Sequence, residues 1–514
     1  MSGVGAVAAG HEQTAQAATD ILAAGGNAFD AVIAAHLAAC VTEPVLASLG
    51  GGGFLLAHPV SQRPVIYDFF PATPLRQPDA GEELDFRPIH ADFGGAVQEF
   101  QIGAASAAVP GSIAGLARIH ADLGYMPMRD IIQPASRLAR EGVEINRFQA
   151  FLSQVVAPII GDNPAVAELF GASSGRLPSP GHRLAIPRLV DAFEAMASDG
   201  ADWFYQGAPA QYVARQCSQG GGLLTIQDFS DYRVKVRKPL IVTAMGSRLL
   251  TNPVPACGGV LSMFLLQLLD QMGRDVPDAD SHLRALHLAA AMQATSARRR
   301  DSGIDIRADI ASASRMLDAS YMQQAASDIA ERAVAIRGTT HFSVADAAGN
   351  VASMTVSNGE GSGLVLADFG IQLNNVLGEE DLNPGGFHQW RPGARLASMM
   401  APTVIEQADG TVTALGSGGS NRIRTALPQV IAHLLHDGMD LRRSINACRM
   451  HYEQGHLQVE PGYTDGVVSD LKQMFDHCTV WPEQNLYFGG VHAVEVSKGE
   501  MIAYGDPRRG GAPS

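Results

Sequence analysis

Residues 338–363 read GTTHFSVADAAGNVASMTVSNGEGSG, and this stretch decides the fold. Two segments rich in β-branched residues, 340–346 and 351–357, flank the turn-forming residues AAGN at 347–350. Short alternating segments on either side of a glycine-containing turn are typical of two antiparallel strands. The stretch therefore predicts a β-hairpin that begins close to residue 339.

The expected pairing of this hairpin brings hydroxyl and amide side chains opposite its first residues. If the strands pair right up to the turn, Thr339 and Thr340 lie opposite Asn358 and Ser357, to within about one residue of register. Because side chains alternate along a strand, Thr339 and His341 share one face of the sheet.

A threonine at this place suits one particular kind of catalysis. A Thr hydroxyl is a poor nucleophile unless a base lies beside it, and the α-amine of an N-terminal Thr is such a base. This amine titrates at about 7.7 to 8.0 when it is unperturbed. Gly338, which lacks a Cβ, tolerates the backbone geometry that cleavage before Thr339 requires. Taken alone, the Thr-Thr pair is better explained as the plain start of a β-branched strand.

Outward from the hairpin, the chain alternates between helical and extended patterns. Apolar spacing predicts helices over 15–24, 28–40, 113–123, 129–141, 189–198, 208–216, 261–272, 282–297, 424–436, 441–449 and 465–476. Gly25 and Gly26 end the first helix, and Asn27 caps the second. Further strands are expected over 363–366, 371–374, 403–406 and 411–415. Helices before and after a group of strands favour a layered α/β sandwich.

Composition excludes several classes of function. The chain has 514 residues, 46% of them hydrophobic, and a net charge of −15, which argues against nucleic-acid and anionic-membrane partners. Its five cysteines are scattered and odd in number, so neither a disulfide framework nor a zinc site is indicated. We expect no cofactor and no metal. Without a recognisable secretory signal or membrane-length apolar run, a cytoplasmic protein is expected.

Several blocks of sequence resemble the γ-glutamyltranspeptidase family, in the family's order and over nearly the whole chain. The block TTHFSV at 339–344, with Asp346, Gly349 and Asn350, is similar to the cleavage-site motif of that family. The further blocks are AGGNAFDA at 24–31, GGGGF at 50–54, VPGS at 109–112, IQLNN at 371–375, LASMMAPT at 396–403 and GSGGSNRI at 416–423.

This resemblance implies a four-layer αββα sandwich of the N-terminal-nucleophile hydrolase type. It implies a large segment, 1–338, and a small segment, 339–514, cut from one precursor and intertwined in one unit. Thr339 is implied as the nucleophile, and Ser357 takes the place of a second Thr that bonds to it. Asn358 is implied to bind substrate.

The glycine turn is implied to complete the catalytic residues. The backbone N–H groups of Gly418 and Gly419, with Ser420 beside them, are expected to stabilise the oxyanion. In the family a conserved Arg binds the substrate α-carboxylate, and here Phe70 stands in its place. A phenyl ring does not replace a bidentate Arg–carboxylate pair.

Two other substrate-binding positions depart from the family pattern. Acidic residues are expected to bind a substrate ammonium group, and Glu380 and Asp381 are assigned to this position, although a solvated acidic loop fits them as well. Ser398 and Met399 stand where the family usually has two serines that bind the carboxylate. Arg391, Arg395 and Arg422 are candidates to replace the missing Arg.

The sequence thus predicts an amidohydrolase or acyltransferase that acts on a small γ-glutamyl or related amide. It would function as a large/small heterodimer after self-cleavage, with further dimerisation as an additional expectation. One alternative is a non-glutamyl amide substrate, as in cephalosporin acylases or oxamate amidohydrolases. Another is an unprocessed, catalytically silent binding protein.

Overall fold

The computed structural model of the chain describes residues 5–92, 97–172, 175–273, 281–318, 338–383 and 385–513. Two antiparallel sheets form its centre, one of seven strands and one of six. In spatial order the first contains β22 (Ala512–Pro513), β1 (Gly5–Ala9), β11 (Thr340–Asp346), β12 (Val351–Ser357), β2 (Gly52–His58), β3 (Val65–Asp68) and β8 (Lys235–Arg237). The second contains β21 (Glu500–Tyr504), β20 (Gly490–Ser497), β16 (Val412–Gly418), β15 (Thr403–Glu406), β10 (Ser247–Thr251) and β9 (Leu240–Ala244).

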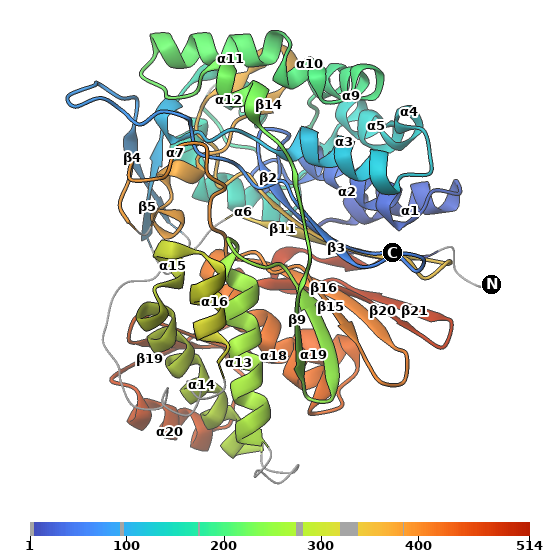
Figure 1. Cartoon of the computed structure of the whole chain (residues 1–514), viewed down its shortest axis with the longest axis vertical. Helices are drawn as coiled ribbons and strands as arrows, with labels where there is room; N and C mark the ends of the chain where they lie inside the picture. Colours follow the sequence, from blue (N-terminus) through green and yellow to red (C-terminus); the bar gives the residue numbers. More distant parts are fainter. Residues whose placement is uncertain are drawn as a thin grey trace.

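The two sheets face each other, and helices cover their outer faces (Figure 1). On the first sheet lie α1 (Glu12–Ala23), α2 (Ala28–Thr42), α3 (Ser112–Leu123), α5 (Gln133–Glu141) and α9 (Arg188–Asp199). Beyond the second sheet lie α13 (Cys257–Gly273), α14 (Ser281–Ser302), α18 (Ile423–Leu435) and α19 (Leu441–Asn446). This arrangement confirms the predicted αββα sandwich.

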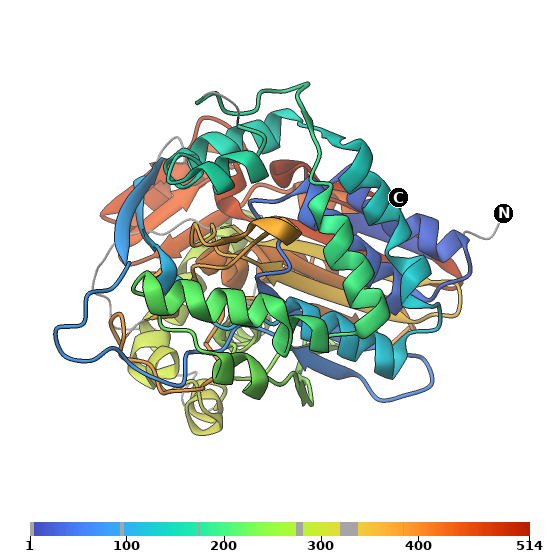
Figure 2. The ribbon, with the colours of Figure 1, turned by 90° about the horizontal axis from the view of Figure 1, so that it is seen from above.

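Smaller elements surround these four layers (Figure 2). The helices are α4 (Met128–Ile131), α6 (Arg147–Val155), α7 (Ala157–Ile160), α8 (Pro164–Leu169), α10 (Asp202–Tyr205), α11 (Ala208–Gln219), α12 (Ile226–Asp231), α15 (Ile304–Arg307), α16 (Ile310–Met316) and α20 (Asp465–Met474). The strands are β4 (Arg87–Asp92), β5 (Val97–Ile102), β6 (Val143–Glu144), β7 (Arg183–Leu184), β13 (Val365–Leu366), β14 (Ile371–Gln372), β17 (Met450–Glu453), β18 (His456–Val459) and β19 (His477–Val480). None of the helices in the described ranges is both long enough and apolar enough to cross a bilayer.

Both sheets combine strands from the two sides of residue 339. The first sheet takes β1, β2, β3 and β8 from before this point and β11, β12 and β22 from after it. The second takes β9 and β10 from before it and the other four strands from after it. Strands from before and after residue 339 therefore pair within the same two sheets.

The β11–β12 hairpin differs from its predicted pairing by one residue. Ala345, and not Asp346, pairs with Val351. Asp346 continues the pairing beyond this point, since its N–H donates to the Asn350 carbonyl at 3.0 Å. The turn is shorter than predicted because Gly349 adopts a left-handed φ of 89°, which closes the loop one residue earlier.

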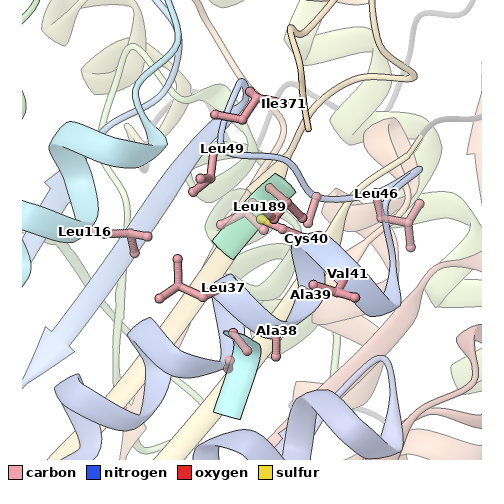
Figure 3. Packing of buried hydrophobic residues seen from close by; sticks show 14 of the residues in the cluster. Leu37, Ala38, Ala39, Cys40, Val41, Leu46, Leu49, Leu116, Leu189 and Ile371 are labelled. Carbon is pink, nitrogen blue, oxygen red and sulfur yellow. The ribbon is translucent and has the colours of Figure 1, made fainter. Parts of the chain in front are cut away.

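Helix α2 precedes the segment that leads to β2. Its N-terminus has the predicted cap: Asn27 accepts from the N–H groups of Phe29 and Asp30, and Asp30 accepts in return. All of its side chains are buried, and its last turns pack among Leu46, Leu49 and neighbouring apolar residues (Figure 3). This packing fixes the segment that leads from α2 to β2.

Two predicted helices are shorter than expected. The helix over 129–141 is interrupted at Ile132, because Pro134 starts a new helix and cannot donate a backbone hydrogen bond. The helix over 441–449 ends at Asn446. The Arg449 side chain turns back there to donate to the Ile445 carbonyl at 2.8 Å.

Candidate active site

Thr339 lies directly before β11 and is buried, with 5% of its surface exposed. Its strand faces the second sheet, where a Cβ added to Gly418 would lie 2.1 Å from the Thr339 carbonyl oxygen. Two residues further on, His341 packs against Gly416 on the same side. The start of β11 is therefore held between the two sheets, against the glycine turn.

Both backbone polar groups of Gly338, the residue before Thr339, form hydrogen bonds with side chains. The Ser357 hydroxyl donates to the Gly338 carbonyl oxygen at 2.5 Å. Glu360, a residue that sequence reasoning missed, accepts from the Gly338 N–H at 3.1 Å. The Gly359 N–H in turn donates to the Ser357 hydroxyl at 2.9 Å. These contacts hold the Gly338–Thr339 peptide group, whose carbonyl carbon would be attacked if the chain were cut before Thr339.

The corrected register places Thr339 opposite Ser357, where the sequence had suggested Asn358. Ser357 pairs in turn with Gly52 on β2. The β2–β3 register continues this row to Phe70, the second residue after the end of β3. With strands about 4.8 Å apart, Phe70 lies roughly 14 Å from Thr339 along the row.

Phe70 fills its position with an apolar ring. It is 2% exposed and stacks on Phe54, with ring centroids 5.5 Å apart and an 18° interplanar angle. Both rings belong to the apolar core between the sheets. The position that the family resemblance gives to a carboxylate-binding Arg is thus part of the core here.

Of the candidate replacement arginines, only Arg395 lies next to Phe70, where its Nη1 donates to the Phe70 carbonyl oxygen, and its charge is already paired. The buried Arg395 forms an ion pair with Asp68 at 3.1 Å and donates to the Tyr232 hydroxyl at 2.7 Å. Arg391 is exposed. Arg422 is buried beneath the glycine turn, where its Nε donates to the Tyr487 carbonyl at 3.1 Å.

The side chain of Asn358 suits a ligand contact. It is fully buried, and neither its Oδ1 nor its Nδ2 has a hydrogen-bond partner among the described residues. A buried amide without partners costs free energy, so such groups in native sites often mark the place of a bound molecule or water. Asn358 follows Ser357 directly, which keeps it next to Thr339.

The acidic position is corrected by one residue. Glu380 is exposed, whereas Glu379 is buried, with its Oε1 2.5 Å from the position of a Cβ built on Gly359. Glu379 therefore lies beside Glu360 in the chain segment that contacts Gly338. The side chain of Asp381 lies outside the described part of the structure.

The glycine turn is at the predicted place. Gly418 ends β16 opposite Gly490, and Gly419 follows with a φ of 117°. Ser420 has a φ of 50°, an uncommon conformation for a residue with a side chain. Such local strain is frequent at functional sites. The roles of Gly418, Gly419 and Ser420 as oxyanion and substrate contacts stay predictions.

Ser398 and Met399 precede β15 beside the start of α13. The buried Ser398 hydroxyl accepts from the Met400 N–H at 3.2 Å. Met399 packs in the core under α13 and α14, which does not favour its assignment as a substrate contact. This core is separate from the one between the sheets that contains Phe70.

The histidines near Thr339 have a structural role. His341 is buried, with its ring nitrogens 2.8 Å from the Thr355 hydroxyl and 2.9 Å from that of Ser343. Burial holds the pKa of His341 well below its usual value. In the part of the chain that the structure describes, no three His, Cys, Asp or Glu side chains are placed to hold a metal ion.

Sequence reasoning also missed two buried charged residues beside the strand, Glu43 and Arg509. Glu43 ends α2, and its Oε1 accepts from the Thr340 hydroxyl at 3.1 Å. Burial raises the pKa of the Glu43 carboxyl to about 7. The available signal was an acidic residue directly after a helix made mostly of apolar residues. Arg509 offered none, because its contact with Thr339 spans 170 positions.

Glu43 makes the stability of the fold dependent on pH. Its carboxyl holds a proton in the folded state up to about pH 7 but has an ordinary value of 4.5, so stability falls as pH rises between these values. Glu43→Gln does not titrate and should avoid this loss. We expect the variant to gain about 2 to 4 kcal/mol relative to the parent between pH 4 and 8.

The measurement is urea denaturation at several pH values, with both proteins carrying Thr339→Ala so that neither is cut. A difference between the two proteins that stays constant over the pH range would contradict the predicted titration of Glu43.

Comparisons with known proteins show the family of the chain. The sequence model of the family described as gamma-glutamyltranspeptidase matches residues 14–514. The glutathione hydrolase proenzyme of Pseudomonas aeruginosa is 29% identical over 98% of this chain and 93% of its own length. The acylase ACY 1 proenzyme of Pseudomonas sp. strain SE83 is 28% identical over 91% of this chain and 86% of its own.

The fold is also found among solved structures. Cephalosporin acylase from Bacillus halodurans has a TM-score of 0.84 and 22% identity, over 99% of this chain and 95% of that one. Since the family model spans nearly the whole sequence and the relatives match it along most of their length, the chain belongs to the γ-glutamyltranspeptidase family.

Proposed function

We propose that Thr339 is the nucleophile of this amidohydrolase and that the chain cuts itself before Thr339. The observation that carries the proposal is the contact of the Ser357 hydroxyl with the Gly338 carbonyl, beside the buried Thr339. A hydroxyl donor at 2.5 Å stabilises the negative charge that develops on this oxygen when the carbonyl carbon is attacked. The proenzyme names of the relatives support the same maturation.

Maturation is a balanced acyl shift followed by hydrolysis. The Thr339 hydroxyl oxygen attacks the Gly338 carbonyl carbon, the C–N bond breaks, and the hydroxyl proton passes to the departing nitrogen. Water then hydrolyses the ester, leaving a carboxylate on Gly338 and an α-amine on Thr339. Segments 1–338 and 339–514 stay together because both sheets contain strands from each.

Catalysis repeats this chemistry on an external amide. The α-amine takes the Thr339 hydroxyl proton while the oxygen attacks the substrate carbonyl carbon. Backbone N–H groups of the glycine turn, at Gly418 and Gly419, stabilise the tetrahedral oxyanion. The amine product leaves with a proton, and water or an acceptor amine then releases the acyl group from Thr339.

The charges around Gly338 favour a particular acyl group. Glu360 and Glu379 are buried beside it and suit an ammonium group. At the other end of the row, Phe70 stacks on Phe54 and offers no charge to a carboxylate. We therefore propose a small amide whose acyl group carries an amine and whose recognition does not depend on an α-carboxylate. This favours a substrate related to γ-glutamyl amides over glutathione itself.

Three anilides that differ in one group each test this substrate class on mature protein. The 4-aminobutanoyl anilide is the γ-glutamyl anilide without its α-carboxylate, and the glutaryl anilide lacks only the amine. We expect kcat/KM for the 4-aminobutanoyl compound to equal or exceed that for the γ-glutamyl compound. An enzyme with the usual Arg should lose about 30- to 1000-fold on the same change.

The glutaryl anilide should be the poorest of the three, because its carboxylate has no amine to offset repulsion by Glu360 and Glu379. The readout is aniline release, with Thr339→Ala protein as the blank. A preference of more than about tenfold for the γ-glutamyl compound would mean that another cation binds its carboxylate.

A further inference from the structure

A buried guanidinium contacts the carbonyl of Thr339 from the C-terminal end of the chain. Arg509, in the turn Pro507–Arg509, is 3% exposed. Its Nη1 donates to the Thr339 carbonyl oxygen and its Nη2 to that of Leu486, each at 3.3 Å. Its Nε has no hydrogen-bond partner among the described residues.

The glycine turn is packed around this guanidinium. A Cβ built on Gly418 would lie 3.1 Å from Nη1 of Arg509, and one on Gly419 would lie 3.2 Å from Nη2. A Cβ on Gly490, opposite Gly418, would lie 2.5 Å from Cδ of the same arginine. Arg509 therefore lies where the nucleophile and the turn expected to bind the oxyanion meet.

Two buried acids that contact the neighbouring arginines, Asp506 and Glu460, are already paired. Asp506 contacts Arg449 at 2.7 Å and Arg508 at 3.3 Å. Glu460 contacts Arg508 at 2.6 Å. Within the described ranges, Arg509 itself forms no ion pair, so these two acids offset two other cations.

The surrounding charged groups compensate this charge only in part, because Asp506 and Glu43 are opposed by the like charges of Arg422 and Arg449. Burial lowers the pKa of Arg509 to about 9, so it stays cationic at neutral pH, and Arg422 nearby adds a like charge. Burial lowers the pKa of His492 to about 4 and that of His341 well below its usual value, so both rings are neutral. Glu43, across β11, has a pKa of about 7 and carries only part of a negative charge at that pH.

We propose that Arg509 is a positioning residue that fixes the Thr339 carbonyl and uses its charge to keep the Thr339 α-amine unprotonated at neutral pH. A nearby cation disfavours the ammonium form, and only the free amine accepts the hydroxyl proton. This inference rests on the proposed role of Thr339. The carboxylate of Glu360 would favour the protonated form of the Thr339 α-amine. The positive charge of Arg509 offsets this effect of Glu360.

The test compares Arg509→Met, which removes the charge, with Arg509→Lys, which keeps it. The α-amine pKa is measured on mature protein by competitive acetic anhydride labelling over a range of pH, read by mass spectrometry of the peptide that starts at Thr339. We expect this pKa to rise by about one unit or more in Arg509→Met. Arg509→Lys should recover at least half of the shift. Arg391→Met, at an exposed arginine, should show none.

The activity profile provides a second readout. The acidic limb of kcat/KM against pH should move upward with the amine pKa in Arg509→Met, while the alkaline plateau stays within about tenfold of the parent. A merely structural role would lower the plateau and leave the limb in place. An unchanged amine pKa in Arg509→Met would overturn the proposal.

Two controls keep the outcome interpretable. Thermal melting establishes that each variant is folded, and co-expression of segments 1–338 and 339–514 supplies mature protein if a variant does not cut itself. Amine labelling does not depend on turnover. A parent protein with a titrating Thr339 amine but no amidase activity would therefore contradict the proposed function and leave the Arg509 result standing.

Discussion

Thr339→Ala is expected to remain a single uncut chain of 54.1 kDa on denaturing electrophoresis, while the parent protein gives two fragments. Alanine keeps the backbone and the burial at this position but has no oxygen to attack the Gly338 carbonyl. Hydrolysis of any amide by the variant should fall to the level of the blank, a loss of about a million-fold if catalysis depends on this one hydroxyl. Intact mass determination measures the cut directly.

Thr340→Val is the matched control for this variant. Thr340 is the neighbouring threonine, but its hydroxyl lies on the other face of the strand and donates to Glu43. The valine variant should therefore still give fragments that end at Gly338 and begin at Thr339. If Thr339→Ala also matures into two fragments, the assigned cleavage site is wrong. If neither variant nor parent is cut, the silent binding protein becomes the better description.

How much of the fold the sequence predicts depends on how local its determinants are. The β11–β12 hairpin and helix α2 follow from alternation, a turn glycine and the Asn27 cap, all of which act within a few residues. Strands β2 and β20 were not predicted. Nearly all residues of β2 and the first five residues of β20 are buried, so the polar alternation of a half-exposed strand is weak there.

The pairing of the hairpin shows how a local rule fails by one residue. The sequence suggested a four-residue turn, but the Asp346 carboxylate accepts from the N–H groups of Ala348 and Asn350, which folds the turn more tightly. Because the strand register shifts by one residue, Ser357 and not Asn358 lies opposite Thr339. The family resemblance had given Ser357 a bond to the nucleophile, whereas in the uncut chain the Ser357 hydroxyl donates to the Gly338 carbonyl, so its role toward Thr339 stays a prediction.

Site residues that belong to sequence motifs could be named from the sequence. Residues whose position depends on tertiary contacts could not. The sequence does not distinguish Glu379 from Glu380, and only the fold shows that Glu379 is buried while Glu380 is exposed. Arg509 comes from the last turn of the chain, and its position depends on the glycines of β16 and β20. Periodicity carries no information about such contacts.

Ser357→Ala is expected to slow both self-cleavage and acylation by about ten- to a thousand-fold. In the uncut chain the Ser357 hydroxyl donates to the carbonyl oxygen that becomes negatively charged during cleavage. In the mature protein Gly338 is a free chain end, and the same hydroxyl can orient the Thr339 hydroxyl or amine in the next strand. Removing it deprives both reactions of one well-placed donor.

The effect on stability should be much smaller than the effect on rate. In mature protein, the alanine variant loses the bond from the Gly359 N–H to the Ser357 hydroxyl, which is worth about 1 kcal/mol. Ser357→Thr retains the hydroxyl and should keep acylation within about tenfold of the parent. Thermal melting of all three proteins distinguishes lost stability from lost catalysis.

Slow maturation must be separated from slow catalysis, because incomplete cleavage lowers activity without any defect in the mature site. Single-turnover acylation is therefore measured on fully cut protein, prepared where necessary by co-expressing segments 1–338 and 339–514. Self-cleavage is followed separately by the loss of the intact chain after synthesis. If fully cut Ser357→Ala acylates at the parent rate, Ser357 acts in maturation alone. The mature amine and hydroxyl must then be oriented by other groups, and one candidate is the amide of Asn358, which follows Ser357 directly and has no hydrogen-bond partner among the described residues.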